Sequence, residues 1–173
     1  MKPTDTMDIG RGHVLKNRSV LAAMTNKQSH EDGTLSDDEI NWLSRRADGG
    51  FAVTTTAAAN VTEHGRGWEG EMGVWGDHHI PGLTKLATRL NSTGTISLVQ
   101  LFHGGMRAPR AINGVRPISA SENTEQGMDG EYTREMSSIE VSQMIQSFTD
   151  AAVRCEQAGF SGVELHGAHS YFC

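Results

Sequence analysis

Short apolar runs alternate along the chain with stretches in which apolar residues recur every three or four positions. The short runs have the length and composition of strands that are buried on both faces. They occupy residues 19–23, 51–56, 95–101 and 160–165. Ahead of them, residues 7–9 and 13–15 predict an N-terminal hairpin, because Gly10 and Gly12 allow the positive φ of a tight turn.

Three stretches with helical spacing lie between these runs. The first follows Ser36 and the third follows Ser137, and each serine has a glutamate three positions later, which is the capping-box pattern. The second opens at Ile80 and has a proline in its first turn. Glycines at positions 49, 94 and 159 predict where the three helices end.

Strands that alternate with helices predict an α/β fold with a parallel sheet and right-handed crossovers. The chain has 173 residues, of which 36% are hydrophobic, and this suits a single domain over residues 1–173, or part of one. Residues 102–136 have no convincing period, and a loop of that length inside a compact domain is usually functional or mobile.

Composition narrows the range of partners and compartments. The net charge is −6 and the basic residues are scattered, which argues against nucleic acid or an anionic membrane and favours small-molecule ligands. Cys155 and Cys173 have neither a disulfide pattern nor a metal-binding spacing, so a reducing cytoplasm fits best. The N-terminus has no apolar signal region and no apolar run approaches membrane-spanning length, so we expect neither export nor insertion.

Polar or small residues follow each predicted strand, where the carboxyl ends of parallel strands meet at one face. They are residues 22–25, residues 54–57, Gln100 with His103, and the group His166, His169 and Tyr171. The amide of Gln100 both donates and accepts hydrogen bonds, which suits the edge of a heterocycle, although neighbouring backbone would satisfy it equally well.

His166 and His169 lie three positions apart at a strand end, so both can present imidazole donors to a developing negative charge. A purely structural role is the alternative, and zinc binding together with His103 is another, although no third ligand or supporting carboxylate is well placed. Tyr171 is a candidate proton donor to carbon, or a residue that packs the rim.

Four ordered motifs resemble the Old Yellow Enzyme family of FMN-dependent NAD(P)H oxidoreductases. The similarity extends from about Met7 to Tyr171 and implies an eightfold βα barrel, a TIM barrel, with FMN across its mouth. The motifs are Leu15-Lys-Asn-Arg18 with Ala23-Met-Thr25, Gln100-Leu-Phe-His-Gly-Gly-Met-Arg107, Ala158-Gly-Phe160, and Gly162-Val-Glu-Leu-His-Gly-Ala-His169.

The resemblance implies a role for each matching residue. Gln100 would bond the pyrimidine edge of FMN, the Thr25 hydroxyl would approach the flavin carbonyl edge, and Thr56 would offer a backbone contact. His166 and His169 would hold the oxygen of the acceptor, and Tyr171 would donate the proton. The backbone bordering the flavin ring would come from Ala22, Ala23, Met24 and Thr25.

Three positions depart from the family pattern. Ala23 stands where the family often has proline, Ser170 where glycine usually precedes the tyrosine, and Thr56 where alanine is common. The resemblance also implies that the chain holds about the first four βα units, while the FMN phosphate would be bound by the remaining four.

The function expected from these observations is reduction of activated alkenes, such as enones and nitroalkenes, by hydride transfer from reduced FMN, with NADH or NADPH as the reductant. The chain alone is expected to be inactive or to act with a homo-oligomeric or complementary half-barrel partner. A non-enzymatic half-barrel and a metal-dependent barrel hydrolase that uses His103, His166 and His169 remain as alternatives.

Overall fold

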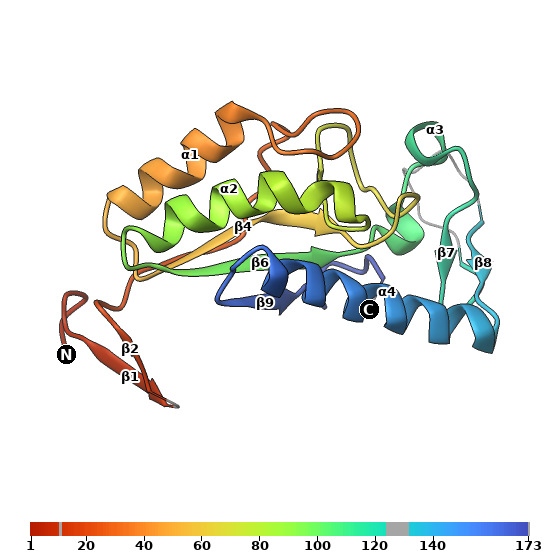
Figure 1. Cartoon of the computed structure of the whole chain (residues 1–173). Coiled ribbons are helices and arrows are strands. Elements are labelled where there is room, and N and C mark those ends of the chain that lie inside the picture. Colours follow the sequence, from red (N-terminus) through yellow and green to blue (C-terminus); the bar gives the residue numbers. More distant parts are fainter. Residues whose placement is uncertain (11, 124–131, 173) are drawn as a thin grey trace.

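The structure is a computed structural model that describes residues 1–10, 12–123 and 132–172. It is a parallel sheet with helices packed along one face, and a small antiparallel hairpin stands apart at one end (Figure 1). The hairpin consists of β1 (Met7–Gly10) and β2 (His13–Leu15), as the glycine pattern predicts, and its turn residue Arg11 lies outside the described residues.

The main sheet has the order β3-β4-β6-β9, and every pairing in it is parallel. Its strands are β3 (Val20–Leu21), β4 (Val53–Asn60), β6 (Ile96–Phe102) and β9 (Gly162–Leu165), while the short β5 (Met72–Gly73) pairs with the end of β4. The predicted parallel α/β sheet is therefore confirmed.

Three long helices cover one face of the sheet: α1 (Asp37–Asp48), α2 (Ile80–Asn91) and α4 (Ser138–Gln157). The capping box of α4 is complete, with Ser137 and Glu140 each bonding the other's backbone. In α1 only half of the expected box forms. The Ser36 hydroxyl accepts from the Glu39 N–H over 3.1 Å, but the Glu39 carboxylate accepts from Asn26, in the loop after β3, and not from the Ser36 backbone.

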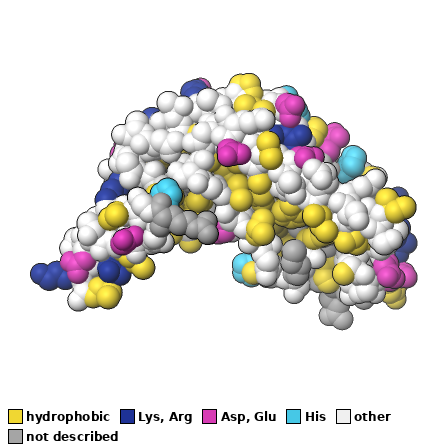
Figure 2. Space-filling view, turned by 60° about the horizontal axis from the view of Figure 1, so that its bottom comes forward, with side chains coloured by type: hydrophobic (Ala, Val, Ile, Leu, Met, Phe, Trp, Pro, Cys, Tyr) yellow, Lys and Arg dark blue, Asp and Glu magenta, His cyan; other side chains and the backbone are white. Residues whose placement is uncertain are grey.

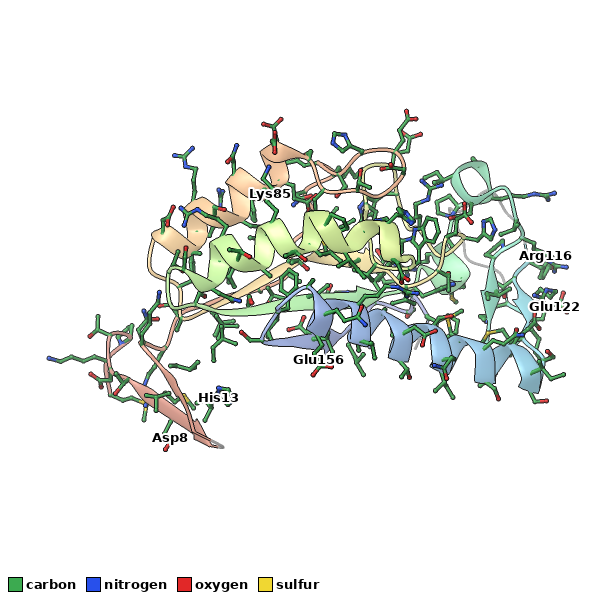
Figure 3. The ribbon with its side chains drawn as sticks, viewed as in Figure 1. Asp8, His13, Lys85, Arg116, Glu122 and Glu156 are labelled. Atoms are coloured by element: carbon green, nitrogen blue, oxygen red, sulfur yellow. The ribbon has the colours of Figure 1, made fainter. Side chains whose placement is uncertain are left out.

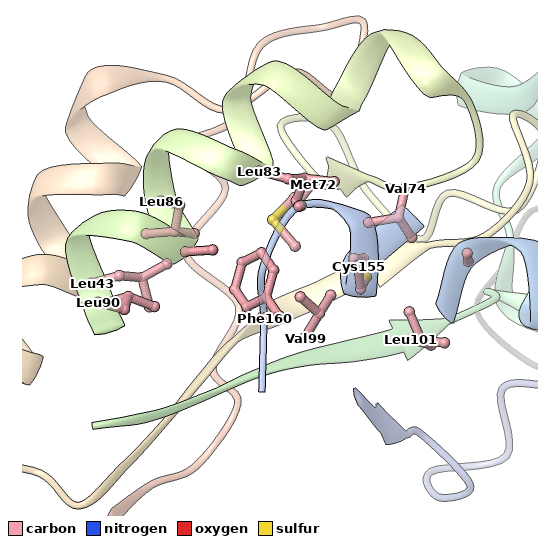
Figure 4. Close-up of a cluster of buried hydrophobic side chains, with 14 of the residues drawn as sticks. Leu43, Met72, Val74, Leu83, Leu86, Leu90, Val99, Leu101, Cys155 and Phe160 are labelled. Atoms are coloured by element: carbon pink, nitrogen blue, oxygen red, sulfur yellow. The ribbon is translucent and has the colours of Figure 1, made fainter. Parts of the chain in front are cut away.

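The core lies between the helices and the sheet (Figure 4). Leu43, Leu86 and Leu90 join α1 to α2, and Val99 and Leu101 of β6 face them from the sheet. A smaller cluster of Leu15, Ala52 and Val53 lies where the end of the hairpin meets the sheet. Burial of these apolar surfaces is what holds the layers together.

A polar contact links the exposed faces of two helices. Lys85 of α2 lies 2.7 Å from Asp37 of α1, and it is labelled in Figure 3. Figure 2 shows apolar side chains gathered on the underside of the molecule, and an apolar groove of about 500 Å³ there runs between α4 and β9. No helix in the described residues is both long and apolar enough to cross a lipid bilayer.

The structure departs from the sequence-based prediction in three places. β3 has only two residues and Val20 is 54% exposed, so the expected buried strand over residues 19–23 is wrong in length and burial. β5 was not predicted, because two residues carry no period. The span expected to be irregular holds short elements: η2 (Gly105–Arg107), α3 (Arg110–Asn113), β7 (Ile118–Ser119) and β8 (Arg134–Glu135). A further short 3-10 helix, η1 (Asp77–His79), leads into α2.

Candidate active site

A cavity of about 380 Å³ opens at the carboxyl edge of the sheet. Strand register places two of its lining residues side by side, because Ala58 of β4 is the partner of Gln100 on β6. The residues that line it are Ala23, Met24, Thr25, Ala58, Trp68, Gln100, Arg107, His166, His169 and Tyr171.

Seven of the nine residues predicted for the site line this cavity, and Ala22 and Thr56 do not. Ala22 is exposed beside β3. Thr56 is fully buried, and its hydroxyl donates to the Ala57 carbonyl over 2.7 Å and accepts from the Gln100 N–H over 3.3 Å. A register irregularity between Thr55 and Ala58 explains this, since an extra residue there turns Ala58 towards Gln100.

The two histidines are hydrogen-bonded to each other, with 3.2 Å between His169 Nδ1 and His166 Nε2. The Ala168 N–H donates to His166 Nδ1 over 3.4 Å, so in the neutral ring that nitrogen is the acceptor and the proton is on Nε2. His166 then donates to His169, which leaves the Nε2–H of His169 for a ligand. In this arrangement His169 presents the outward donor and His166 lies behind it. That both rings present donors to a ligand stays a prediction.

Tyr171 lies at the centre of a group of rings that sequence analysis did not assemble. Its ring packs edge to face against Phe102, with 4.7 Å between centroids, and lies 5.4 Å from the ring of His166. Phe102 also contacts Trp68 at 5.3 Å. The Arg107 guanidinium carbon lies 5.6 Å from the Tyr171 ring. Phe102 is fully buried, so it forms a fixed platform for the rim.

The backbone beneath Tyr171 is tightly constrained. His169 and Ser170 have φ values of 61° and 53°, which are unfavourable for residues with a side chain. Gly105 has φ 54°, and a Cβ at that position would lie 2.0 Å from the Tyr171 carbonyl oxygen. The same oxygen accepts from the Met106 N–H over 3.2 Å. The backbone at Gly105 and Met106 thus holds the tyrosine segment in place.

Two buried glutamates anchor the loops that reach the cavity. The Glu71 carboxyl accepts from the Gly67 N–H over 2.6 Å, next to Trp68, and burial raises its pKa well above the usual value. Glu39 accepts from Asn26 Nδ2 over 3.0 Å and from the Ser29 hydroxyl, just beyond Thr25, and burial likewise raises its pKa. Neither residue was predicted for the site, and no local pattern distinguishes them.

His103 does not join the other two histidines. It is buried, its Nδ1 accepts from the Gly105 N–H over 2.9 Å, and burial lowers its pKa to about 4. Within the described ranges there is no group of three or more histidine, cysteine or acidic residues able to hold a metal. The geometry thus gives no support to a zinc hydrolase built on His103, His166 and His169.

His79, at the end of η1, is buried, although histidines outside the main helices and strands are usually solvated. It is 2% exposed, it packs against Trp75 with 5.2 Å between ring centroids, and neither ring nitrogen has a hydrogen-bond partner in the described structure. Burial lowers its pKa to about 4, so this ring is a neutral packing residue.

These features suit a planar heterocycle and an oxygen-bearing acceptor. The backbone of Ala23 to Thr25, with Ala58 and Trp68, offers apolar and small surfaces for a flat ring. Gln100 offers an edge that donates and accepts, and His169 offers a donor to an acceptor oxygen beside the Tyr171 hydroxyl.

Comparison with known proteins agrees with this chemistry. Residues 5–173 match the model of the NADH:flavin oxidoreductase / NADH oxidase family. The probable NADH-dependent flavin oxidoreductase YqiG of Bacillus subtilis is 35% identical over 164 residues, which is 92% of this chain and 42% of that protein. An NADH:acrylate oxidoreductase of Vibrio harveyi is 37% identical over 161 residues, and there the chain covers 16% of the relative.

Solved structures give the same fold. A 2-naphthoyl-CoA reductase complex aligns with a TM-score of 0.92 and 28% identity over 98% of this chain and 28% of that one. An Old Yellow Enzyme homologue from Zymomonas mobilis aligns with a TM-score of 0.91 and 23% identity, over 99% of this chain and 50% of that one. The sheet and helices are therefore part of a TIM barrel, and the chain spans about half or less of the relatives it matches.

Proposed function

We propose, from the premise that the chain belongs to the NADH:flavin oxidoreductase / NADH oxidase family, that it carries the flavin-ring and acceptor sites of an FMN-dependent NAD(P)H oxidoreductase acting on activated alkenes. The observation that supports this best is the convergence of Gln100, His169 and Tyr171 on one cavity at the carboxyl edge of the sheet. The relatives compared above include an NADH-dependent flavin oxidoreductase and an acrylate oxidoreductase.

The cavity residues fit a flavin ring. Ala23, Met24 and Thr25 would border the ring, and Gln100 would bond its pyrimidine edge, which carries both N–H and carbonyl groups. When bound, FMN supplies hydride transfer between NAD(P)H and the alkene. The residues of the chain would position the flavin ring and the acceptor and would supply the proton to the alkene.

The acceptor would be held by the histidine pair. The Nε2–H of His169 donates to the acceptor's carbonyl or nitro oxygen, and His166 fixes the His169 tautomer from behind. Tyr171, packed on Phe102, would place its hydroxyl for proton transfer to the α-carbon of the alkene. Small acceptors that present a hydrogen-bonding oxygen suit this arrangement.

Two measurements test the proposal on the chain combined with a complementary half-barrel, which would bind the FMN phosphate. The first is a titration with FMN, followed by quenching of flavin fluorescence, and saturable binding is expected. The second compares the half-reactions of the Tyr171→Phe variant in the same complex under anaerobic conditions. Because only alkene reduction needs the phenolic proton, reduction of bound flavin by NAD(P)H should be unchanged, and reoxidation by an enone should slow by roughly 10²-fold or more.

The control is Tyr132→Phe, since Tyr132 is 59% exposed and does not line the cavity. It should leave both half-reactions unchanged. Absence of FMN binding would contradict the proposed function, and equal slowing of both half-reactions in Tyr171→Phe would remove Tyr171 from the donor role.

A further inference from the structure

We infer that Glu164 is a positioning residue that fixes the orientation of the Gln100 side-chain amide. In that orientation the amide can hydrogen-bond to a ring edge that has an N–H beside a carbonyl. This inference rests on the proposed function, which identifies that edge as part of FMN. Gln100 on β6 and Glu164 on β9 are register partners, and Gln100 Nε2 donates to Glu164 Oε1 over 2.6 Å.

The chemistry of the pair decides how the amide is turned. An ionised carboxylate only accepts hydrogen bonds, so the group of Gln100 that faces it is the NH2 and not the carbonyl. The opposite orientation would place the amide oxygen against the carboxylate oxygens. In the described part of the chain Glu164 is the single hydrogen-bond partner of this amide, so it alone sets the orientation.

The strand itself is also fixed at this point. The Gln100 backbone N–H donates to the Thr56 hydroxyl over 3.3 Å on the β4 side, while Glu164 holds the side chain on the β9 side. Both neighbours of Gln100 in the sheet therefore restrain it, and its side chain borders the cavity. A restrained amide loses less conformational entropy when a ligand binds.

The restrained amide keeps two groups for a ligand. An NH2 has two hydrogens, and the carboxylate takes one of them, which leaves one N–H donor and the carbonyl acceptor. This pair matches a ring edge that presents a carbonyl next to an N–H, as the pyrimidine portion of FMN does at N3. Glu164 thus acts on the ring through Gln100 and needs no contact with it.

The hydrogen bond can be tested without any flavin. In a spectrum of the 15N-labelled full chain, assigned with Gln100→Leu, one of the two Gln100 side-chain protons should be shifted downfield by its hydrogen bond to the carboxylate. Glu164→Gln should reduce that shift. A Gln100 amide whose two protons have ordinary shifts in wild type would overturn the inference.

The effect on the ligand is tested with FMN and with its N3-methyl derivative, which lacks the N3 proton. Wild type should prefer FMN. Glu164→Gln should bind FMN roughly tenfold more weakly and should discriminate less between the two flavins, since its Gln100 amide can turn either way. The matched control is Glu156→Gln, which also removes one negative charge, on the exposed surface of α4 (Figure 3).

The outcomes separate the inference from the proposed function. If wild type binds FMN and Glu164→Gln equals wild type in affinity and discrimination, the role of Glu164 is refuted while the proposed function stands. If wild type binds neither flavin, the proposed function and the ligand assignment fail together, and the spectrum still decides whether Glu164 orients the amide.

Discussion

Gly105→Ala is expected to displace the tyrosine segment. A Cβ at residue 105 would lie 2.0 Å from the Tyr171 carbonyl oxygen and 2.7 Å from the Phe172 Cα. Real Cβ contacts essentially never fall below 3.0 Å, so the two backbones must separate by about 1 Å. That movement breaks the bond from the Met106 N–H to the Tyr171 carbonyl and disturbs the contact between Tyr171 and Phe102.

The magnitude follows from three contributions. The left-handed φ of 54° penalises alanine by about 1 kcal/mol, the lost hydrogen bond contributes about 1 kcal/mol, and the disturbed ring pair contributes about 1 kcal/mol. We therefore expect Gly105→Ala to lower the free energy of unfolding by about 3 kcal/mol. Gly114→Ala separates the first contribution from the others, because Gly114 has φ 70° and empty space around its would-be Cβ. It should lose only about 1 kcal/mol.

The assay combines urea unfolding of both variants with hydrogen exchange of the peptide that contains Met106. Gly105→Ala should accelerate exchange of the Met106 amide, and Gly114→Ala should leave it as in wild type. If the two variants match in both measurements, the packing of Gly105 against Tyr171 is not what holds the segment, and the reasoning fails.

Two further predictions concern stability. Ser170→Gly should raise the free energy of unfolding by about 0.5–1 kcal/mol, because glycine relieves the φ of 53°, and a lower melting temperature would contradict this. The contributions of His79 and His103 to the free energy of unfolding should each fall by up to about 3 kcal/mol as pH drops from 6.5 to about 4, because the unfolded chain takes up protons in this range while the buried rings resist protonation. His79→Phe should flatten that slope in urea unfolding at several pH values, and an unchanged slope would show that His79 does not cause it.

Sequence patterns predicted the fold wherever a local signal has a single physical meaning. Ser137 with Glu140 marks the start of α4 because both side chains satisfy free N–H groups of the first turn. The same pattern at Ser36 predicted the start of α1 but not the fate of Glu39, whose carboxylate bonds Asn26 and Ser29. That choice depends on tertiary contacts, which no local pattern contains.

The candidate site likewise has residues that local signals predict and residues whose position depends on tertiary contacts. Strand-end positions and family motifs predict one site for Gln100, His166, His169 and Tyr171, and all four line the cavity. They did not place Ala58, because the register irregularity in β4 that turns it towards the cavity has no signature in a run of small residues. The roles assigned to the predicted residues stay predictions until the variants above are measured.

The hydrogen bonds from Ala168 to His166 and from His166 to His169 run in the same donor-to-acceptor order. Each member donates to the next, so the last imidazole of the series ends in a donor. A ligand that presents a lone pair continues the series, whereas one that presents only a hydroxyl or ammonium hydrogen would need both rings to exchange tautomers and would lose the Ala168 bond. The pair therefore favours ligands that offer a hydrogen-bond acceptor over ligands that offer only a donor, whatever their size or shape.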